Sequence, residues 1–417
     1  MTGIGSPQIR EYGIDRNVFG WPELGLSVEA NHITDDGKCE LYFYHQNGDS
    51  KPVLMHWGGA NFLSSTYLRE FTKSLSTRIS TDLDWQTILT IISRLTMQHL
   101  REGPPIENMN LPPSTAKLEY QLYPIVLKGE PTTIYGPGGF GKSILADFIA
   151  VLVQCNVAAA NWTPIAGNVL YLDWEANLTR HQQCVQAIKK GLEIDDTDII
   201  RYQFCEHDLV SMADSIRKRV RDEKIDLVII DSQMAATASP RPGTDASTVA
   251  SAYYNTLRSF HCSSLTIDHV NKTGMQDDSA GDTAYGSVVK YNRSRNQWLV
   301  KRTQEPEEDA IELSLMHKKF NYGMIRKSIG LRIEYTNVDD VLTSIRFNHC
   351  SLEDNPILAR TMTLTDRVIA ALRDGPCSVD KLLDNIEAKE ASVRKTLGRG
   401  VERGLFIKDG NTWGLNV

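Results

Sequence analysis

The chain has 417 residues, of which 41% are hydrophobic and 23% are charged, and its formal net charge is −7. This composition is that of a folded protein with room for two or three domains. The acidic balance excludes a protein that coats nucleic acid with its whole surface, although a local basic channel or patch stays open. The seven cysteines are dispersed and never spaced as CxxC, so the sequence predicts neither a disulfide framework nor a zinc site.

No apolar run is long enough for a membrane helix, and the first residues lack a basic segment followed by an apolar one. We therefore expect a cytoplasmic protein that does not contact a membrane.

Residues 1–110 predict an α+β accessory domain, whose role the sequence does not indicate. Short strand-like runs at 25–30 and 40–44 are followed by helical patterns at 66–79 and 85–102. Two Pro-Pro pairs then mark an extended linker that leads to the next domain.

A glycine-rich segment follows the strand-like run 132–135 and precedes the apolar, helix-like run 144–150. Glycines at this spacing let backbone N–H groups turn around phosphate oxygens, a lysine reaches the outer phosphates, and a serine hydroxyl binds Mg²⁺. The segment therefore predicts a site for ATP with Mg²⁺. The residues expected to contact the nucleotide are Gly136, Pro137, Gly138, Gly139, Phe140, Gly141, Lys142, Ser143 and Ile144.

Residues 111–355 predict an α/β core. The uniformly apolar runs 168–172, 226–230 and 264–268 are typical of buried parallel strands. Four later runs predict an antiparallel extension of the same sheet, and they lie at 298–301, 311–316, 329–335 and 342–348.

Acidic side chains follow two of the predicted parallel strands. Asp231 ends the run 226–230, where a carboxylate can hold the Mg²⁺ shell through water. Glu175 lies just past the strand 168–172, where it can polarise the attacking water as a general base. Asp173 is the rival candidate for that role.

Three further residues are catalytic candidates. His269 ends the next predicted strand and is placed to bind the γ-phosphate or the attacking water, although a lone histidine is more often structural. Arg293 and Arg295 precede the following strand, where an arginine can stabilise transition-state charge in its own site or in a neighbour's. The alternative for these arginines is a solvated surface position.

Residues 356–417 predict a winged helix-turn-helix, because three helical patterns are followed by two short strands around the turn Asp409-Gly-Asn. In such a domain the third helix usually enters the major groove of DNA. The DNA-contact candidates here are Arg394, Lys395 and Arg399. Winged helices also bind proteins, so a protein-contact module stays the alternative.

The motifs of the core, in their order along the chain, resemble those of RecA-like ATPases of the KaiC, DnaB and RecA superfamily. The closest resemblance is to the RepA-type hexameric helicases, over residues 120–350. It rests on Gly136 to Ser143, Leu170 to Glu175, Val228 to Asp231, His269 to Lys272 and Gly286 to Arg295.

The resemblance implies a homo-oligomer, either a ring or a filament, in which ATP is bound between subunits. A hexameric ring is the form that we expect from the family. It implies that Lys142 and Ser143 bind phosphate and Mg²⁺ and that Asp231 supports the metal. It also implies that Glu175 is the catalytic carboxylate, His269 a γ-phosphate sensor, and Arg295 the finger that completes a neighbour's site.

In this family the loops at 235–247 and 273–285 face single-stranded DNA in the ring channel. The basic candidates there are Arg241 and Lys272, but four aspartates, Asp245, Asp277, Asp278 and Asp282, weaken the basic track that DNA binding needs. Two hypotheses therefore stay open. One is a DNA helicase or translocase, and the other is an ATP-gated DNA-binding regulator or assembly factor that does not unwind strands.

Overall fold

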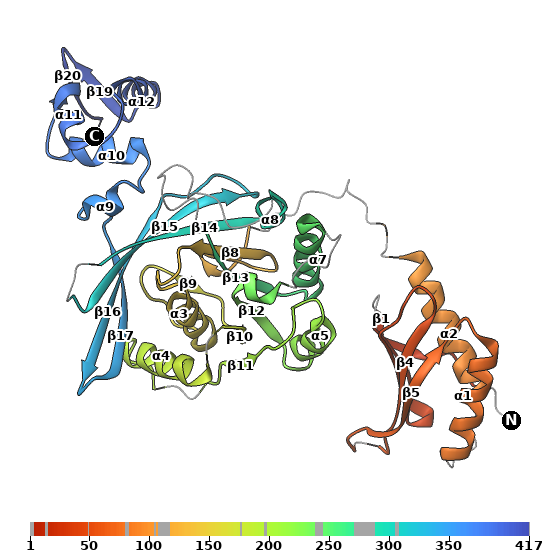
Figure 1. Cartoon of the computed structure of the whole chain (residues 1–417). Coiled ribbons are helices and arrows are strands. Elements are labelled where there is room, and N and C mark those ends of the chain that lie inside the picture. The colour runs from red at the N-terminus through yellow and green to blue at the C-terminus, as the bar shows by residue number, and fades with distance from the viewer. Residues whose placement is uncertain are drawn as a thin grey trace. The chain divides into compact units, whose positions relative to one another are not determined.

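The computed structural model describes residues 4–12, 16–48, 50–79, 83–103, 106, 117–175, 177–195, 198–237, 245–270, 288–304 and 308–416. By its internal contacts the chain divides into two compact units, Met1–Thr115 and Ala116–Val417 (Figure 1).

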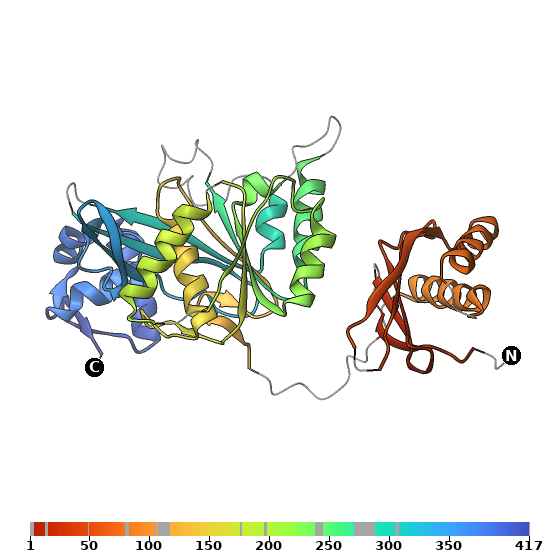
Figure 2. The ribbon, with the colours of Figure 1, turned by 90° about the horizontal axis from the view of Figure 1, so that it is seen from below.

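The first unit is a five-stranded antiparallel sheet with two helices on one face (Figure 2). Its core forms because alternate residues of β3 and β4 are apolar and buried, and the Phe43 and Trp85 rings meet edge to face at 5.7 Å between centroids. Ser64 and Asp84 cap the helices by accepting hydrogen bonds from backbone N–H groups. The elements are β1 (Gln8–Tyr12), β2 (Arg16–Trp21), η1 (Pro22–Leu24), β3 (Leu26–Asn31), β4 (Lys38–His45), β5 (Val53–Asn61), α1 (Ser65–Arg78) and α2 (Trp85–Glu102).

The second unit is built on a nine-stranded sheet in the order β11-β10-β12-β13-β8-β14-β15-β16-β17. The first six strands are parallel and the last three are antiparallel. The strands are β8 (Pro131–Gly136), β10 (Asn168–Asp173), β11 (Arg201–Phe204), β12 (Ile225–Asp231), β13 (Ser263–His269), β14 (Asn296–Thr303), β15 (Ala310–Phe320), β16 (Ile329–Val338) and β17 (Val341–Cys350).

Helices cover both faces of the parallel part of this sheet, which is why its strands are apolar without alternation (Figure 2). Leu227 and Ile229 of β12 pack in the apolar cluster that includes α3 and α4, whereas Val228 and Ile230 pack in the cluster that includes α5 and α7. The helices are α3 (Lys142–Cys155), α4 (Leu178–Gly191), α5 (Ala213–Asp222), α6 (Gln233–Ala236), α7 (Ala246–Ser259) and α8 (Val288–Arg293). A small separate sheet joins β6 (Tyr120–Tyr123), β7 (Val126–Leu127) and β9 (Thr163–Pro164).

Strand β14 corrects one prediction. The run 298–301 was expected to be antiparallel, but β14 pairs in parallel with β8, with Trp298 opposite Ile134, and the antiparallel extension begins only at β15. An apolar run shows that a strand is buried but not which way it runs. The consequence is that the start of β14 lies at the same edge of the sheet as the start of β8. Val300 lies beside Gly136 at the end of β8, and β14 continues past this point to Thr303.

The C-terminal segment has an apolar cluster of its own, made by three helices and a three-stranded sheet in the order β18-β20-β19. Thr363 and Ser378 cap α10 and α11 with their hydroxyl groups. The elements are α9 (Pro356–Ala359), α10 (Leu364–Arg373), β18 (Cys377–Ser378), α11 (Val379–Asn385), α12 (Glu390–Glu402), β19 (Phe406–Asp409) and β20 (Thr412–Leu415). None of the helices in the described ranges is both long and apolar enough to cross a membrane.

Two glycines of α12 have different surroundings. A Cβ atom on Gly400 would lie 2.0 Å from the Phe406 ring, so the hairpin packs directly on the helix backbone at this position. A Cβ atom on Gly398 would have no neighbour within 4 Å. Of these two glycines, only Gly400 is needed for the close approach of the helix and the hairpin.

We predict that Gly400→Ala destabilises the C-terminal segment by about 1–3 kcal/mol through overpacking. The matched change Gly398→Ala is expected to stabilise it by roughly 0.5–1 kcal/mol, because alanine is the better helix former. Chemical denaturation of the full chain measures both variants. Equal effects of the two substitutions would contradict the packing of Phe406 on the helix.

Candidate functional site

The loop between β8 and α3 is shaped by glycines. Gly139 and Gly141 have φ angles of +75° and +77°, in the left-handed region that other residues rarely adopt. At Gly136 a Cβ atom would lie 2.7 Å from the Val300 carbonyl oxygen of β14, so no larger residue fits. The loop therefore presents its backbone N–H groups and the N-terminus of α3 toward the same space, which is the arrangement that binds phosphate.

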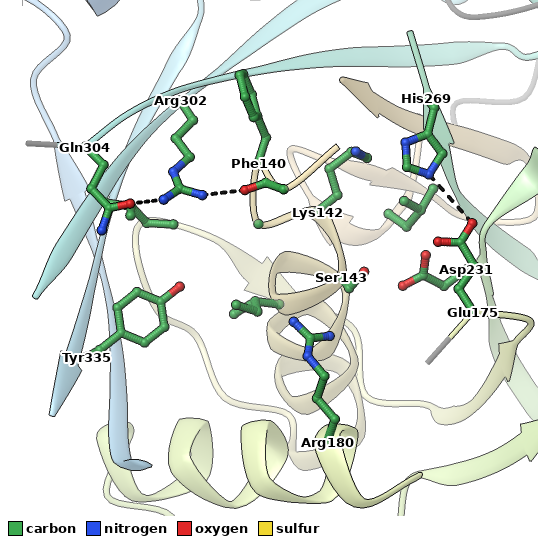
Figure 3. Close-up of a pocket in the computed structure, with 15 residues that line it drawn as sticks. Phe140, Lys142, Ser143, Glu175, Arg180, Asp231, His269, Arg302, Gln304 and Tyr335 are labelled. Carbon is green, nitrogen blue, oxygen red and sulfur yellow. Dashed lines mark hydrogen bonds and ion pairs between the residues drawn. The ribbon is translucent and has the colours of Figure 1, made fainter. Parts of the chain in front are cut away.

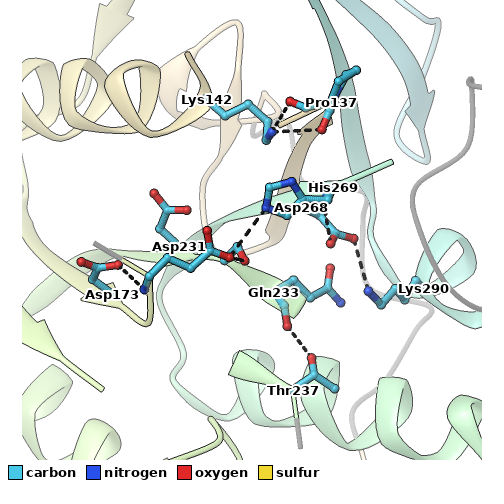
Figure 4. Close-up of polar contacts among 12 residues, drawn as sticks. Pro137, Lys142, Asp173, Asp231, Gln233, Thr237, Asp268, His269 and Lys290 are labelled. Atoms are coloured by element: carbon cyan, nitrogen blue, oxygen red, sulfur yellow. Dashed lines mark hydrogen bonds and ion pairs between the residues drawn. The ribbon is translucent and has the colours of Figure 1, made fainter. Parts of the chain in front are cut away.

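Lys142 is the first residue of α3 and is buried at 5% exposure. Its Nζ donates hydrogen bonds to the carbonyl oxygens of Gly136, at 2.9 Å, and Pro137, at 2.7 Å (Figure 4). Burial lowers the pKa of the ammonium group, and the nearby carboxylates of Asp231 and Glu175 oppose that effect. The lysine is thus held over the loop at the position where it can reach a phosphate.

Parallel pairing brings the ends of neighbouring strands to this loop. Asp173 of β10 lies opposite Asp231 of β12, and His269 of β13 lies opposite Gly136 of β8. Since all of these strands point the same way, the polar residues that end them meet at one edge of the sheet. The predicted catalytic residues Glu175 and His269 and the predicted metal-supporting residue Asp231 all line the same cavity as Lys142 (Figure 3).

Asp231 is suited to support a magnesium ion. Its carboxylate is 3% exposed, and burial raises its pKa, against hydrogen bonds from the hydroxyls of Ser143 and Tyr171. The Tyr171 hydroxyl donates to Oδ2 at 2.9 Å. No group of three or more His, Cys, Asp or Glu side chains in the described ranges could hold a metal by itself. Magnesium in nucleotide sites needs only one or two protein oxygens besides phosphate and water, and Ser143 with Asp231 fits that need.

Glu175 extends into the cavity from the loop after β10. Its Oε1 accepts a hydrogen bond from the Ser232 hydroxyl and lies 3.7 Å from Nε2 of His269 (Figure 3). The interaction with His269 lowers the pKa of Glu175, and burial only partly opposes it. The carboxylate is therefore ionised at neutral pH and able to accept a proton from water. Its rival, Asp173, is completely buried and outside the lining of the cavity.

The cavity has a volume of about 480 Å³ and continues past the phosphate loop to a second end that the sequence did not predict. There the Arg302 guanidinium donates to the carbonyl oxygen of Gly139 and to the Gln304 side chain (Figure 3). Besides Ile144 of the predicted segment, the residues that line this end are Arg180, Arg302, Gln304, Ile311 and Tyr335. Apolar and planar side chains with a few polar groups are typical of a pocket for a flat organic ring.

No local pattern marks this second end in the sequence, because Arg302, Ile311 and Tyr335 belong to three different strands of the sheet extension. They come together only through the pairing of β14, β15 and β16.

Arg295 does not reach this cavity. It directly precedes β14, whose Asn296 pairs with Thr132 near the start of β8, so it lies at the sheet edge opposite the phosphate loop. Its carbonyl oxygen accepts a hydrogen bond from the Asn321 backbone at 3.0 Å. Arg293 does not line the cavity either, and its guanidinium lies 3.5 Å from the Ser251 hydroxyl. The channel-loop candidates Arg241 and Lys272 lie outside the described residues.

Residues 107–275 match the family described as an AAA domain. The match contains the phosphate loop, Glu175, Asp231 and His269, and together with the mostly parallel sheet it supports a P-loop ATPase core. Such a domain implies nucleotide binding. No curated protein matches the chain.

We predict that Glu175→Gln lowers the rate of ATP hydrolysis by about 10²–10⁴-fold, because the amide cannot accept the proton of the attacking water. Binding of a fluorescent ATP analogue should persist, since Lys142 and the loop are unchanged. Glu206→Gln is the matched control, because this exposed glutamate follows the neighbouring strand β11 and lies outside the cavity lining. Equal activity of the two variants would contradict the role of Glu175.

Proposed function

We propose that this protein is an ATP-hydrolysing, DNA-associated motor, an oligomeric helicase or translocase of the RecA and RepA type. The observation that carries the proposal is the convergence of Lys142, Ser143, Glu175, Asp231 and His269 on one cavity. These are the positions that the resemblance to RepA-type helicases assigns to ATP hydrolysis.

The chemistry follows from what each side chain can do. The loop N–H groups and Lys142 bind the phosphates of ATP. Ser143 and Asp231 would hold Mg²⁺, which supplies charge neutralisation at the phosphates. Glu175 orients and deprotonates the attacking water. His269 lies beside Glu175, so it can register whether a γ-phosphate is present.

The position of Arg295 favours an oligomer. Because it lies at the sheet edge opposite the phosphate loop, it is available to another copy of the chain rather than to its own cavity. A ring in which Arg295 of each subunit completes the site of its neighbour is the arrangement that the resemblance implies.

The C-terminal elements support contact with duplex DNA. Their order of three helices and a hairpin supports the proposal of a winged helix-turn-helix, in which α12 would take the place of the DNA-reading helix. Arg394 is exposed but donates to Glu390 at 2.7 Å, so its charge is partly neutralised. Lys395 and Arg399 are exposed on the same helix and are the stronger candidates for phosphate contacts.

A second function is an ATP-gated regulator or assembly factor that binds DNA without unwinding it. The sequence of the channel loops favours this alternative, because Asp245, Asp277, Asp278 and Asp282 oppose a basic track for single strands.

We predict that single-stranded DNA raises the ATPase rate of the full chain severalfold, because a motor couples hydrolysis to movement along a strand. A coupled assay with an oligothymidylate of increasing length measures the effect. Lys142→Ala, without activity, is the control for contaminating ATPases.

An ATPase rate that no nucleic acid changes, together with loss of activity in Lys142→Ala, would refute the motor and keep the ATPase. Tight duplex binding that needs residues 360–417 but not hydrolysis would then favour the regulator.

We predict that Arg295→Ala lowers ATP hydrolysis, and that mixing this variant with inactive Lys142→Ala restores part of the activity. In the mixed assembly an intact cavity of one variant faces the Arg295 of the other. Arg293→Ala is the matched control and should keep its activity in unmixed form. Light scattering with an ATP analogue reports whether the assembly forms.

Mixing without any recovery would contradict a shared site, provided that both variants assemble. A monomeric protein with full activity would contradict the role of Arg295 altogether.

A further inference from the structure

His181 is a buried histidine near the candidate site, and it takes no part in the proposed chemistry. It belongs to the first turn of α4 and is 4% exposed. Its Nδ1 lies 2.8 Å from Oδ1 of Asp147, on α3, and its Nε2 lies 3.3 Å from Oδ2 of Asp173, at the end of β10. Both carboxylates are almost completely buried, at 1% and 0% exposure. The imidazole thus bridges two buried acids from different elements.

A carboxylate beside each ring nitrogen favours the doubly protonated ring, because an ionised carboxylate only accepts protons. Nδ1 is hydrogen-bonded to Asp147, and Nε2 forms the longer ion pair with Asp173. Burial alone would lower the pKa of His181, but the interactions with Asp147 and Asp173 outweigh it and raise the pKa to about 9. Burial raises the pKa of Asp147 to about 6, so this acid is still ionised at neutral pH. His181 is therefore the cation of a buried ionic triad.

A second buried histidine, His317, differs from His181 in its polar partners. His317 on β15 has its Nε2 2.9 Å from the side-chain oxygen of Asn296, and its Nδ1 accepts a hydrogen bond from the Arg326 backbone at 3.0 Å. A neutral imidazole has one N–H that donates and one nitrogen that accepts, and the two contacts of His317 match this pattern. Burial and the charge of Arg326 lower the pKa of His317 to about 4. Partners, rather than burial, decide which of the two histidines is charged.

The triad is joined through Asp173 to the loop that carries Glu175. Oδ1 of Asp173 accepts the backbone N–H of Glu175 at 2.9 Å, and Oδ2 accepts the Tyr202 hydroxyl at 2.8 Å. Asp147 lies on α3, five residues after the phosphate-loop lysine. The charge on His181 therefore ties the helix that begins at the phosphate loop to the residue that anchors the main chain of Glu175.

Tyrosine rings hold the imidazole in place. The Tyr171 ring lies 4.6 Å from the imidazole between centroids, and the Tyr202 ring lies 5.7 Å from it. The Tyr171 hydroxyl donates to Asp231, so the same packing also reaches the residue that would support the metal. Two strand-end carboxylates, those of Asp173 and Asp231, and the Asp147 carboxylate of α3 are thus coupled around a single ring.

We propose that His181 is a positioning residue whose imidazolium, held between Asp147 and Asp173, sets the distance between the phosphate loop and the Glu175 carboxylate. This inference rests on the proposed ATPase function, because the position of Glu175 matters only if it acts on water. Loss of the cation leaves two buried carboxylates facing each other, and their repulsion moves Asp173 and the main chain of Glu175. A displacement of about 1 Å at a catalytic group can cost about 10²-fold in rate.

We predict that His181→Gln lowers kcat for ATP by about 10²-fold while KM for ATP and binding of a fluorescent ATP analogue change little. The reason is that Lys142 and the loop glycines keep their contacts, whereas Glu175 loses its position. The control His317→Gln, which replaces a buried but neutral histidine of the same unit, should leave kcat close to that of the wild type.

An unchanged kcat in His181→Gln, or equal losses of kcat in both histidine variants, would overturn the proposal. Wild-type protein without any ATPase activity would overturn the proposed function as well, so the two failures are distinguishable.

The double variant His181→Gln, Asp147→Asn tests whether repulsion between the two carboxylates causes the loss, and it also serves if the single variant folds poorly. It removes one negative charge with the positive one, so thermal stability should recover. Part of the lost kcat should recover with it, because Asp173 no longer faces a second buried carboxylate. A double variant with restored stability but a kcat as low as that of His181→Gln would overturn the proposal.

The pH dependence of unfolding tests the charge itself. The folded pKa of His181, about 9, is raised above the ordinary histidine value of 6.5, so its stabilising contribution is complete below pH 6.5 and is lost as the pH rises through 9. The groups that face the ring are Asp147 from α3, Asp173 and Tyr171 from β10, and Tyr202 from β11. Wild-type stability should fall over this pH range relative to His181→Gln. Parallel curves would overturn the proposal.

Discussion

The site depends on one electrostatic constraint, which is the burial of three aspartates at the ends of three adjacent parallel strands. Asp173, Asp231 and Asp268 are 0%, 3% and 0% exposed. A buried carboxylate must be paired or hydrogen-bonded, because its desolvation is otherwise too costly. Asp173 is paired with His181, and Asp268 with Lys290 at 3.4 Å (Figure 4). Within the described ranges Asp231 has hydroxyl donors but no ion pair with a protein cation, which leaves the middle carboxylate as the one suited to a metal.

The sequence predicted those parts of the site that depend on neighbours along the chain. The phosphate loop, the buried strands and the acids that end them follow from local patterns, since parallel strands collect their final residues at one edge. His181 could not be found in this way. Its two acids come from α3 and β10, and nothing in the spacing of Asp147, Asp173 and His181 shows that they meet. Arg302 and Tyr335 escaped prediction for the same reason, because the antiparallel extension brings them to the cavity through pairing alone.

In the two terminal parts of the chain, local sequence patterns again predict the helices but not which single residues pack against another element. In the N-terminal unit the predicted helices 66–79 and 85–102 match α1 and α2 within one residue, because caps and apolar spacing are local signals. In α12 the two glycines are equivalent in the sequence, yet only Gly400 lies against Phe406. The pairing of Arg394 with Glu390 follows from their spacing of four residues, a signal that lowers the charge available on this helix.

One arginine, Arg295, directly precedes β14, and another, Arg302, lies near the end of this strand, so the two arginines have different possible roles. Arg302 lies at the cavity of its own chain, where it contacts the phosphate loop. Arg295 is seven positions earlier, a separation of about 23 Å along an extended strand. No arginine side chain spans such a distance, so Arg295 cannot act on the cavity that its own strand reaches. Any catalytic role for it therefore requires a second copy of the chain, whereas a role for Arg302 does not.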